Sequence, residues 1–393
     1  MSGGFSAPRL GLIHEGMSAR VESGEVAGLV ALAARGSDVH VEALGMSDLA
    51  AGAKMSRDTI FRIASMTKPI TAVAAMILVE ETRLRLDEPV TRLLPELADR
   101  KVLRSLNSEP DDTVPANRPI TLRDLLTFTF GFGATMSPPG TYPIQKRVAD
   151  AGLGPGPNPS PLSPDDWIER FAGLPLMHQP GERWMYHTGS DVLAVLIARA
   201  AEMPFDQFLA ERIFTPLGMK DTGFAIPDAK RARLARCYER DEDGKLKVSP
   251  MGLDAVNSAG STGLLSTADD YLAFARMLLG NGRLGKTRIL SRPSVELMTM
   301  DHLTPAQKAL SPFAPGFWDL NGWGFGVSVV TRRNGLGPMP GSYGWDGGFG
   351  TSWRNDPPEA MTSIFLSQRM MQSPDDLAIA TDFLTLAYQA IDD

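Results

Sequence analysis

A serine and a lysine stand three residues apart at the start of an apolar helical pattern, in the tetrapeptide Ser65, Met66, Thr67 and Lys68. Residues at this spacing share one face of a helix, so the lysine amine can accept the proton of the serine hydroxyl. Burial would lower the pKa of the lysine, and the positive end of the helix dipole would favour an oxyanion. The spacing therefore indicates a covalent nucleophile, Ser65, with its base, Lys68. The alternative is a helix cap followed by a solvated lysine.

Two further motifs carry groups that could complete such a site. Tyr186 lies in the run from Gly181 to Ser190. A tyrosine near a lysine ammonium ionises more readily and can carry a proton between nucleophile and leaving group, although a core tyrosine has the same signature. The glycine-rich run from Tyr343 to Gly350 allows a backbone to approach a ligand, and one of its amides could join that of Ser65 in an oxyanion hole. A plain β-turn is the alternative for that run.

Predicted strands near both chain ends, with helices between them, would place these motifs at one junction. The predicted strands are 28–34, 39–44, 324–332, 342–347, 351–354 and 362–368. The predicted helices are 11–23, 69–80, 122–127, 165–171, 190–201, 204–213, 267–279, 292–298 and 374–391. This order predicts an α+β fold: an antiparallel sheet built from both termini and flanked by helices, with a large, mostly helical subdomain inserted in it.

The length predicts two lobes within one module, since 393 residues exceed what a single core usually supports. We expect an α/β subdomain from 1–64 plus 300–393 and a helical subdomain from 65–299. Two segments rich in proline and glycine, 131–164 and 304–322, predict long loops. Such loops are often lids over a site.

Composition excludes several classes of function. A net charge of −7 with scattered acidic residues argues against binding to nucleic acid or to anionic lipid, and no apolar run reaches the ~18 residues of a membrane span. The single cysteine, Cys237, and five scattered histidines show no metal-ligand spacing, so we predict no metal and no cofactor. The N-terminus lacks a leader pattern, which predicts a cytoplasmic protein.

The three motifs, in this order, resemble those of the penicillin-recognising serine hydrolases: class C β-lactamases, DD-peptidases and family VIII carboxylesterases. The similar blocks are 61–68 (FRIASMTK), 120–127 (ITLRDLLT), 181–186 (GERWMY) and 260–271 (GSTGLLSTADDY). The resemblance implies a β-lactamase/DD-peptidase-like fold, with Ser65 as nucleophile, Lys68 as proton acceptor and Tyr186 as the tyrosine of the Tyr-x-Asn element. It also implies that Gly348 supplies the second oxyanion amide.

Two departures from the β-lactam enzymes favour the esterases of this group. Thr188 stands where those enzymes have asparagine, and Trp345, Asp346 and Gly347 stand where they have Lys-Thr-Gly. The family's lysine helps to hold a substrate carboxylate, whereas family VIII esterases carry Trp-x-Gly and the tryptophan suits neutral acyl esters. A Gly-x-Ser-x-Gly elbow is absent from the chain, which argues against an α/β-hydrolase.

We therefore expect a serine carboxylesterase that hydrolyses short-chain esters through an acyl-Ser65 intermediate, with a small-molecule ester as its partner. The alternatives are a class C-like β-lactamase or DD-peptidase, an acyltransferase on the same scaffold, and a sensor that is acylated without turnover. The predicted substrate-binding residues are Trp345, Asp346, Gly347, Phe128, Phe130 and His187, with Phe132 as a further pocket candidate.

Overall fold

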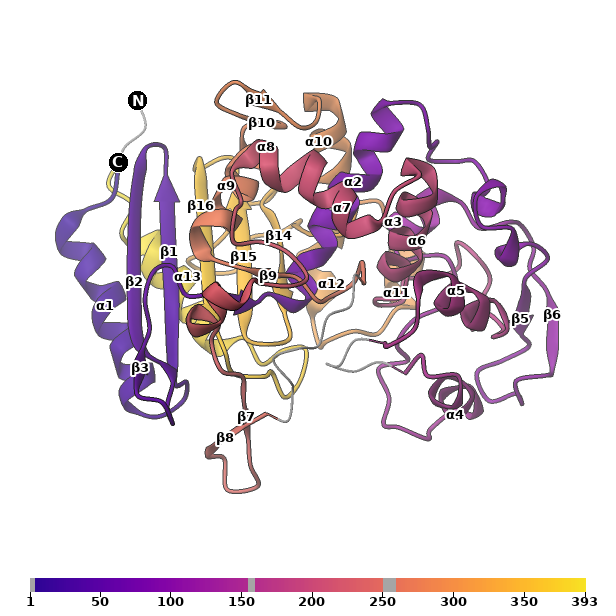
Figure 1. Ribbon diagram of the computed structural model, residues 1–393, viewed down its shortest axis with the longest axis horizontal. Helices are drawn as coiled ribbons and strands as arrows, with labels where there is room; N and C mark the ends of the chain where they lie inside the picture. Colours follow the sequence, from indigo (N-terminus) through magenta and orange to yellow (C-terminus); the bar gives the residue numbers. More distant parts are fainter. Residues whose placement is uncertain (1–3, 155–159, 250–258) are drawn as a thin grey trace.

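Strands from the two ends of the chain form one antiparallel sheet in the computed structural model, which describes residues 4–154, 160–249 and 259–393. The strand order is β12-β13-β14-β15-β16-β1-β2-β3. These strands span Asn321–Trp323, Ser328–Val330, Tyr343–Gly347, Thr351–Asp356, Met361–Ser367, Gly28–Arg35, Asp38–Asp48 and Ala53–Lys54. β1 pairs with β16 over its whole length, which joins the N-terminal and C-terminal parts (Figure 1). The predicted α+β fold is confirmed.

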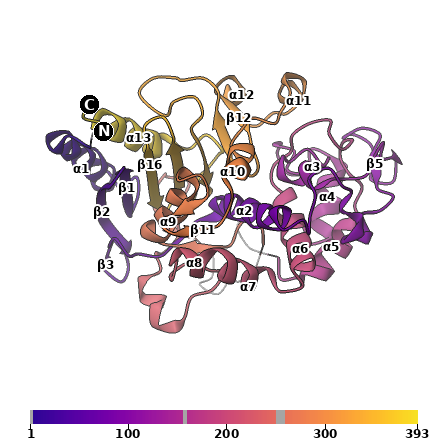
Figure 2. The same cartoon turned by 90° about the horizontal axis from the view of Figure 1, so that it is seen from above.

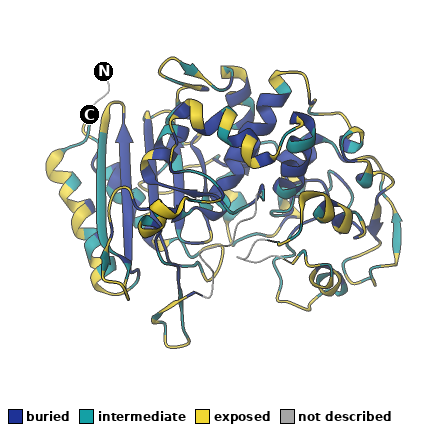
Figure 3. Ribbon diagram, in the orientation of Figure 1, coloured by how far each residue is buried: buried dark blue, intermediate teal, exposed yellow. Residues whose placement is uncertain are grey.

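Helices cover both faces of this sheet because β1 is apolar on both sides. Leu29, Ala31 and Ala33 pack toward α1 (Ala7–Glu22) and α13 (Ala378–Gln389), while Val30 and Leu32 belong to the main core on the other face. Successive side chains of a strand point to opposite faces of the sheet, so a strand covered on both faces is apolar along its whole length. Figure 2 shows α1 and α13 on one side of the sheet and α9 (Ala268–Leu279) on the other. Figure 3 shows β1 buried and the outer side of α1 exposed.

A buried helix, α2 (Thr67–Glu80), links the sheet to a mostly helical part. Its residues from Thr67 to Leu78 are all buried, and it packs against α6 (Gly189–Ala201). The other α-helices are α3 (Leu122–Leu126), α4 (Pro143–Asp150), α5 (Pro164–Ala172), α7 (Phe205–Leu209), α8 (Thr215–Leu217), α10 (Arg292–Met298), α11 (Pro305–Ala309) and α12 (Phe317–Leu320). Within the described residues, no helix has the length and apolar character needed to cross a membrane.

Short pairs of strands and tight helical turns complete the fold. The pairs are β4 (Phe61–Arg62) with β9 (Leu265–Ser266), β5 (Lys101–Leu103) with β6 (Thr113–Pro115), β7 (Tyr238–Arg240) with β8 (Leu246–Val248), and β10 (Arg283–Leu284) with β11 (Thr287–Arg288). The 3₁₀ turns are η1 (Ala64–Met66), η2 (Val90–Arg92), η3 (Pro95–Leu97) and η5 (Asp228–Arg233), and η4 (Ala210–Phe214) is a π turn. The π turn extends α7, so the predicted helix 204–213 is two consecutive elements.

Polar caps begin several helices where the sequence predicted them. The hydroxyl of Thr121 accepts from the backbone N–H of Asp124 at 3.2 Å, at the start of α3. Thr267 does the same with Asp270 at 3.2 Å, at the start of α9. Each cap satisfies one of the N–H groups that a helix leaves unpaired in its first turn. These starts agree with the predicted helices 122–127 and 267–279.

Three predicted segments differ from the structure. The predicted strand 324–332 contains β13 but begins in the turn that joins β12 to β13, where Gly326 has a φ of +69°. The predicted loop 131–164 contains α4, whose Ile144 and Val148 are buried, and its flanking prolines and glycines conceal that pattern. The predicted loop 304–322 contains α11 and α12. The division into 1–64 plus 300–393 and 65–299 stays a prediction, although α9 packs on the sheet.

Candidate active site

Ser65 lies in the turn η1, which connects β4 to α2 and packs against β14 and β15 of the main sheet. The backbone N–H of Ile63 donates to the Leu264 carbonyl at 3.0 Å, and the Ile63 carbonyl accepts from the Thr351 hydroxyl at 3.2 Å. The next residue, Ala64, directly precedes Ser65 and has a φ of 44°. This is a left-handed conformation that a residue with a Cβ rarely adopts. The strained turn is held by contacts on both sides, which is how a nucleophile is kept in one orientation.

Lys68 faces Ser65 from the first turn of α2 and is buried. Its Nζ lies 2.8 Å from the Ser65 Oγ and donates to the Ser261 carbonyl oxygen at 2.7 Å. Burial lowers the pKa of Lys68 to about 7, against an opposing effect of the Asp191 charge. This amine can therefore exist as a neutral base at neutral pH, as the sequence predicted.

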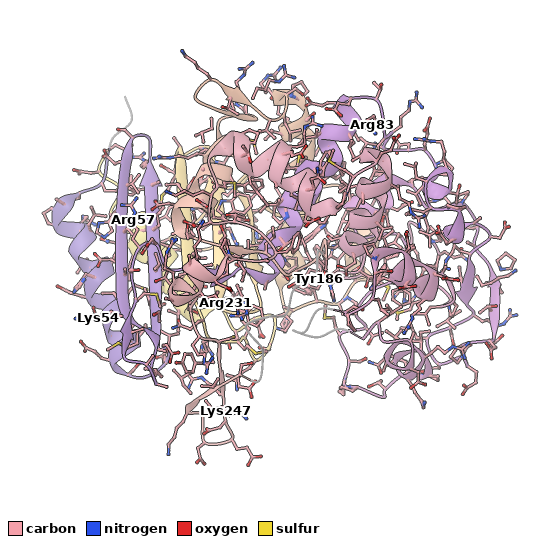
Figure 4. All side chains as sticks on the ribbon, in the orientation of Figure 1. Lys54, Arg57, Arg83, Tyr186, Arg231 and Lys247 are labelled. Carbon is pink, nitrogen blue, oxygen red and sulfur yellow. The ribbon has the colours of Figure 1, made fainter. Side chains whose placement is uncertain are left out.

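Tyr186 stands on the other side of the same amine, near the middle of the molecule (Figure 4). The Lys68 Nζ lies 4.5 Å from its ring centroid, and the indole N–H of Trp345 donates to its hydroxyl at 2.8 Å. Burial raises the pKa of Tyr186 above its ordinary value, although hydrogen bonds with Ser65 and Trp345 oppose this. The prediction of easier ionisation is therefore wrong, and the phenol keeps its proton at neutral pH.

Tyr186 packs against a cluster of aromatic side chains. Trp345 crosses Trp323 perpendicularly at a centroid distance of 4.6 Å, and Phe128 lies 6.0 Å from Tyr186. Both Phe128 and Trp345 are buried. Their packing fixes the indole and phenol rings in place. Trp345, predicted as an apolar wall, is thus also the hydrogen-bond donor that orients Tyr186.

The end of β14 lies directly beside the turn that carries Ser65. A Cβ at Gly347 would stand only 2.3 Å from the Ile63 carbonyl oxygen, so only glycine lets the strand approach this closely. Gly348 follows and is exposed, and no atom lies within 4 Å of the position that its Cβ would take. Gly348 therefore directly follows the strand end that contacts the turn of Ser65, and space is open beside its Cα.

Two predicted substrate-binding residues have other partners. The carboxylate of Asp346 accepts from Arg354 Nη2 at 2.7 Å and from the Ser352 hydroxyl at 2.6 Å, because successive strand residues point to opposite faces and Trp345 takes the face toward Tyr186. Phe130 is fully buried in the main core, 6.1 Å from the ring of Phe171. Neither residue is available to a substrate in this structure.

The motifs that form this site have the same order in the chain as in a known family. A family model described as Beta-lactamase matches residues 14–386. The chain belongs to the beta-lactamase family. This membership confirms the family resemblance inferred from the motifs and agrees with the observed fold.

Relatives within the beta-lactamase family include esterases. The protein Rv1367c of Mycobacterium tuberculosis is 42% identical over 352 residues, covering 87% of this chain and 85% of the relative. Esterase EstB of Burkholderia gladioli is 30% identical, covering 86% and 85%. Among solved structures, EstCE1, a hydrolase with promiscuous acyltransferase activity, is 25% identical with a TM-score of 0.78 over 98% of each chain. These relatives support an enzyme that transfers acyl groups through a serine.

Two residues in this beta-lactamase family site were missed by the sequence analysis. The backbone N–H of Ser261 donates to Asp191 Oδ1 at 3.0 Å, and the carbonyl of the same Ser261 faces Lys68. A signal was available: Asp191 is in the first turn of the helix after Tyr186, and Ser261 is within the block 260–271. Their pairing joins two segments far apart in the sequence, so neither alone indicated a contact with the lysine.

His187, predicted as a substrate contact, lines a cavity beside this site. Its Nδ1 lies 3.9 Å from Asp191 Oδ2, and burial together with the charge of Lys68 lowers its pKa to about 3. The histidine is therefore neutral at ordinary pH. Phe132 lines the same cavity, whose volume is about 880 Å³. Within the described residues, no group of three His, Cys, Asp or Glu side chains could hold a metal ion.

Proposed function

We propose that the protein is a serine carboxylesterase that works through an acyl-Ser65 intermediate. One observation carries this proposal: the Lys68 Nζ lies 2.8 Å from the Ser65 Oγ, and its pKa of about 7 leaves it able to accept a proton. A hydroxyl paired with such a base is an activated nucleophile. The esterases among the relatives support the same chemistry.

Acylation begins when the Ser65 oxygen attacks the ester carbonyl and its proton passes to Lys68. The negative charge that develops on the carbonyl oxygen is held by the backbone N–H groups of Ser65 and Gly348, each worth ~3–4 kcal/mol in comparable sites. Tyr186 then donates its proton to the leaving alcohol and regains one from the Lys68 ammonium 4.5 Å from its ring. Water releases the acyl group by the reverse proton path.

A neutral ester suits the site better than an anionic β-lactam. The indole N–H of Trp345 donates to Tyr186, so the residue that replaces the family's lysine offers no charge to a substrate carboxylate. Asp346, next to it, is neutralised by Arg354. Comparing a p-nitrophenyl ester with a chromogenic cephalosporin tests this, and we expect turnover of the ester to dominate.

Replacing the nucleophile tests the function directly. Ser65→Ala should reduce hydrolysis of p-nitrophenyl butyrate to background, and a fluorescent phosphonate should label the native protein but not this variant. The matched control is Ser37→Ala, in the exposed turn between β1 and β2, which should keep both hydrolysis and labelling. Hydrolysis by Ser65→Ala at the native rate would refute the proposal.

Acyl transfer to an alcohol is the second candidate function. The structural relative EstCE1 is described as a hydrolase with promiscuous acyltransferase activity. Measuring the ratio of transfer to hydrolysis with an added alcohol separates the two, because both reactions share the acyl-Ser65 intermediate. We expect hydrolysis to exceed transfer at low alcohol concentration, and the reverse would make transfer the main activity.

A further inference from the structure

A chamber of about 880 Å³ opens between the helical part and the catalytic groups. Its walls include the loop 132–139, α4, residues from 160–164 and one face of α6. Chambers of this size hold drug-sized molecules, whereas an acetyl or butyryl group would leave most of the space empty. The dimensions therefore disagree with a preference for short-chain esters.

Small side chains on α6 create the hollow. Asp191, Ala194 and Ala198 line the chamber at positions i, i+3 and i+7, which lie on one face of a helix. The two alanines project little from α6, so they leave the chamber more room than larger residues would. On the opposite wall Ala149 of α4 also faces the chamber.

Polar groups in the walls mostly bind one another, so the surface left for a ligand is apolar. The side-chain amide of Gln145 donates to the Thr135 hydroxyl at 3.0 Å, and its oxygen accepts from the Tyr142 N–H at 3.0 Å. At the inner end Asp191 accepts from Ser261. Phe132, Trp167 and several aliphatic residues supply the rest of the wall.

The chamber adjoins the reacting groups. Ser261, whose carbonyl lies 2.7 Å from the Lys68 Nζ, is one of its wall residues. Phe313 is another, and its ring lies 5.6 Å from that of Tyr186. His187, adjacent to Tyr186 in sequence, is a third. A group attached to an ester at Ser65 can therefore extend into the chamber.

We propose that the chamber binds a large apolar group of the ester, such as a long alkyl chain or a fused ring system, and so sets the substrate class. This inference rests on the proposed esterase function and replaces its short-chain limit. Both an acyl chain and an alcohol could supply the apolar group, since both radiate from the carbonyl at Ser65. Burial of each added CH₂ should raise kcat/KM about fourfold until the chamber is filled.

Two series of esters test the proposal and separate the two sources. The first varies the acyl chain of p-nitrophenyl esters from acetate to dodecanoate, and the second varies the alcohol of acetate esters over the same lengths. We expect kcat/KM to rise steeply with length in at least one series, and the series that rises identifies the part of the ester in the chamber. A maximum at four carbons or fewer in both series would overturn the proposal.

A matched pair of variants on α4 locates the effect. Ala149→Trp places an indole among the residues that line the chamber, while Arg147→Trp places the same side chain on the same helix outside that lining, and both positions are exposed. The ratio of kcat/KM for the longest ester to that for the acetate should fall at least tenfold in Ala149→Trp and stay as in the native protein in Arg147→Trp. Equal ratios in both variants would contradict the assignment.

Binding can be measured without catalysis, which separates this inference from the esterase proposal. Trp167 lines the chamber, so 1-decanol or decanoate should change the tryptophan fluorescence of Ser65→Ala with saturation. The change should be lost in the Ser65→Ala, Trp167→Phe double variant. The chamber assignment would be overturned if the double variant kept the full fluorescence change, or if neither decanol nor decanoate changed the fluorescence of Ser65→Ala. Neither outcome would affect phosphonate labelling of Ser65 in the native protein, which tests the esterase proposal.

Discussion

The proton affinity of Lys68 is set by its immediate neighbours. Burial lowers the pKa of the amine to about 7, and the negative charge of Asp191 raises it. Asp191 itself is held by the Ser261 N–H, and burial raises its own pKa. His187, whose pKa is lowered by burial and by Lys68, stays neutral between them. One carboxyl thus tunes the base without touching the substrate carbonyl.

Replacing this carboxyl should move the pH dependence of the reaction. Asp191→Asn keeps an acceptor for the Ser261 N–H but removes the charge that raises the Lys68 pKa. The base form of Lys68 should then persist to lower pH, so the acid limb of kcat/KM against pH should shift down by about one unit. Stopped-flow or plate-reader hydrolysis across pH 5 to 9 measures this.

Asp191→Ala separates tuning from structural support. It removes both the charge and the acceptor, so we expect lower kcat at every pH as the Ser261 carbonyl loses its orientation. An acid limb that is unchanged in Asp191→Asn would show that the Asp191 charge does not act on Lys68.

At the scale of elements, β14 packs against η1, the turn that carries Ser65. The contact depends on Gly347, whose missing side chain makes room for the Ile63 carbonyl. The strand also carries Trp345 on one face, where its indole donates to the Tyr186 hydroxyl. On the other face Asp346 accepts a hydrogen bond from Arg354, and Gly348 follows the strand. Through this strand the main sheet contacts both the turn of Ser65 and the hydroxyl of Tyr186.

A methyl group at Gly347 should separate these elements. In Gly347→Ala the Cβ would stand 2.3 Å from the Ile63 oxygen and 2.2 Å from the Thr351 hydroxyl, so the backbone must move. We expect kcat to fall at least tenfold and the free energy of unfolding to fall by about 1–3 kcal/mol. Ester kinetics and urea denaturation measure the two effects.

Gly348→Ala is the control, because open space surrounds the position of its Cβ. Its free energy of unfolding should remain within about 0.5 kcal/mol of the native value. If Gly347→Ala were as active and as stable as the native protein, the close approach of β14 would not position Ser65.

For the whole molecule, burial of the Lys68 amine lowers the free energy of unfolding at neutral pH. In the unfolded chain Lys68 has an ordinary pKa near 10.5, whereas in the folded protein its pKa is about 7. The unfolded state therefore binds more protons between these values, and the free energy of unfolding should rise with pH across that window. Below pH 7 both states are protonated and the penalty is constant.

An apolar residue at this position should stabilise the protein while abolishing its chemistry. We expect Lys68→Met to raise the free energy of unfolding by about 1–4 kcal/mol at pH 7, because the ammonium is then no longer buried and the neighbouring Asp191, whose pKa burial already raises, can take up a proton. The gain over the native protein should shrink as pH approaches 10, since the folded lysine is neutral there and the unfolded one begins to lose its proton. Urea unfolding at several pH values checks this, and a gain that grew with pH would contradict it.

Local patterns determined much of this protein from the sequence alone. The spacing of Ser65 and Lys68 is a property of one helix turn, and the alternation of apolar residues marked strands at both chain ends. The family resemblance followed from motifs that are likewise continuous in sequence. Tyr186 was identified in the same way, although the direction of its pKa shift depended on its burial in the folded protein.

Only the tertiary structure decided the contacts between distant segments. Trp345 donates to a tyrosine 159 positions earlier, and Ser261 joins Asp191 to Lys68 across the helical part. Phe130 and Phe132 look alike in sequence and both are buried in the main core, yet only Phe132 also lines the chamber. Periodicity reports which face of an element is apolar but not which element packs against it, because that depends on how all the elements together bury their apolar surface.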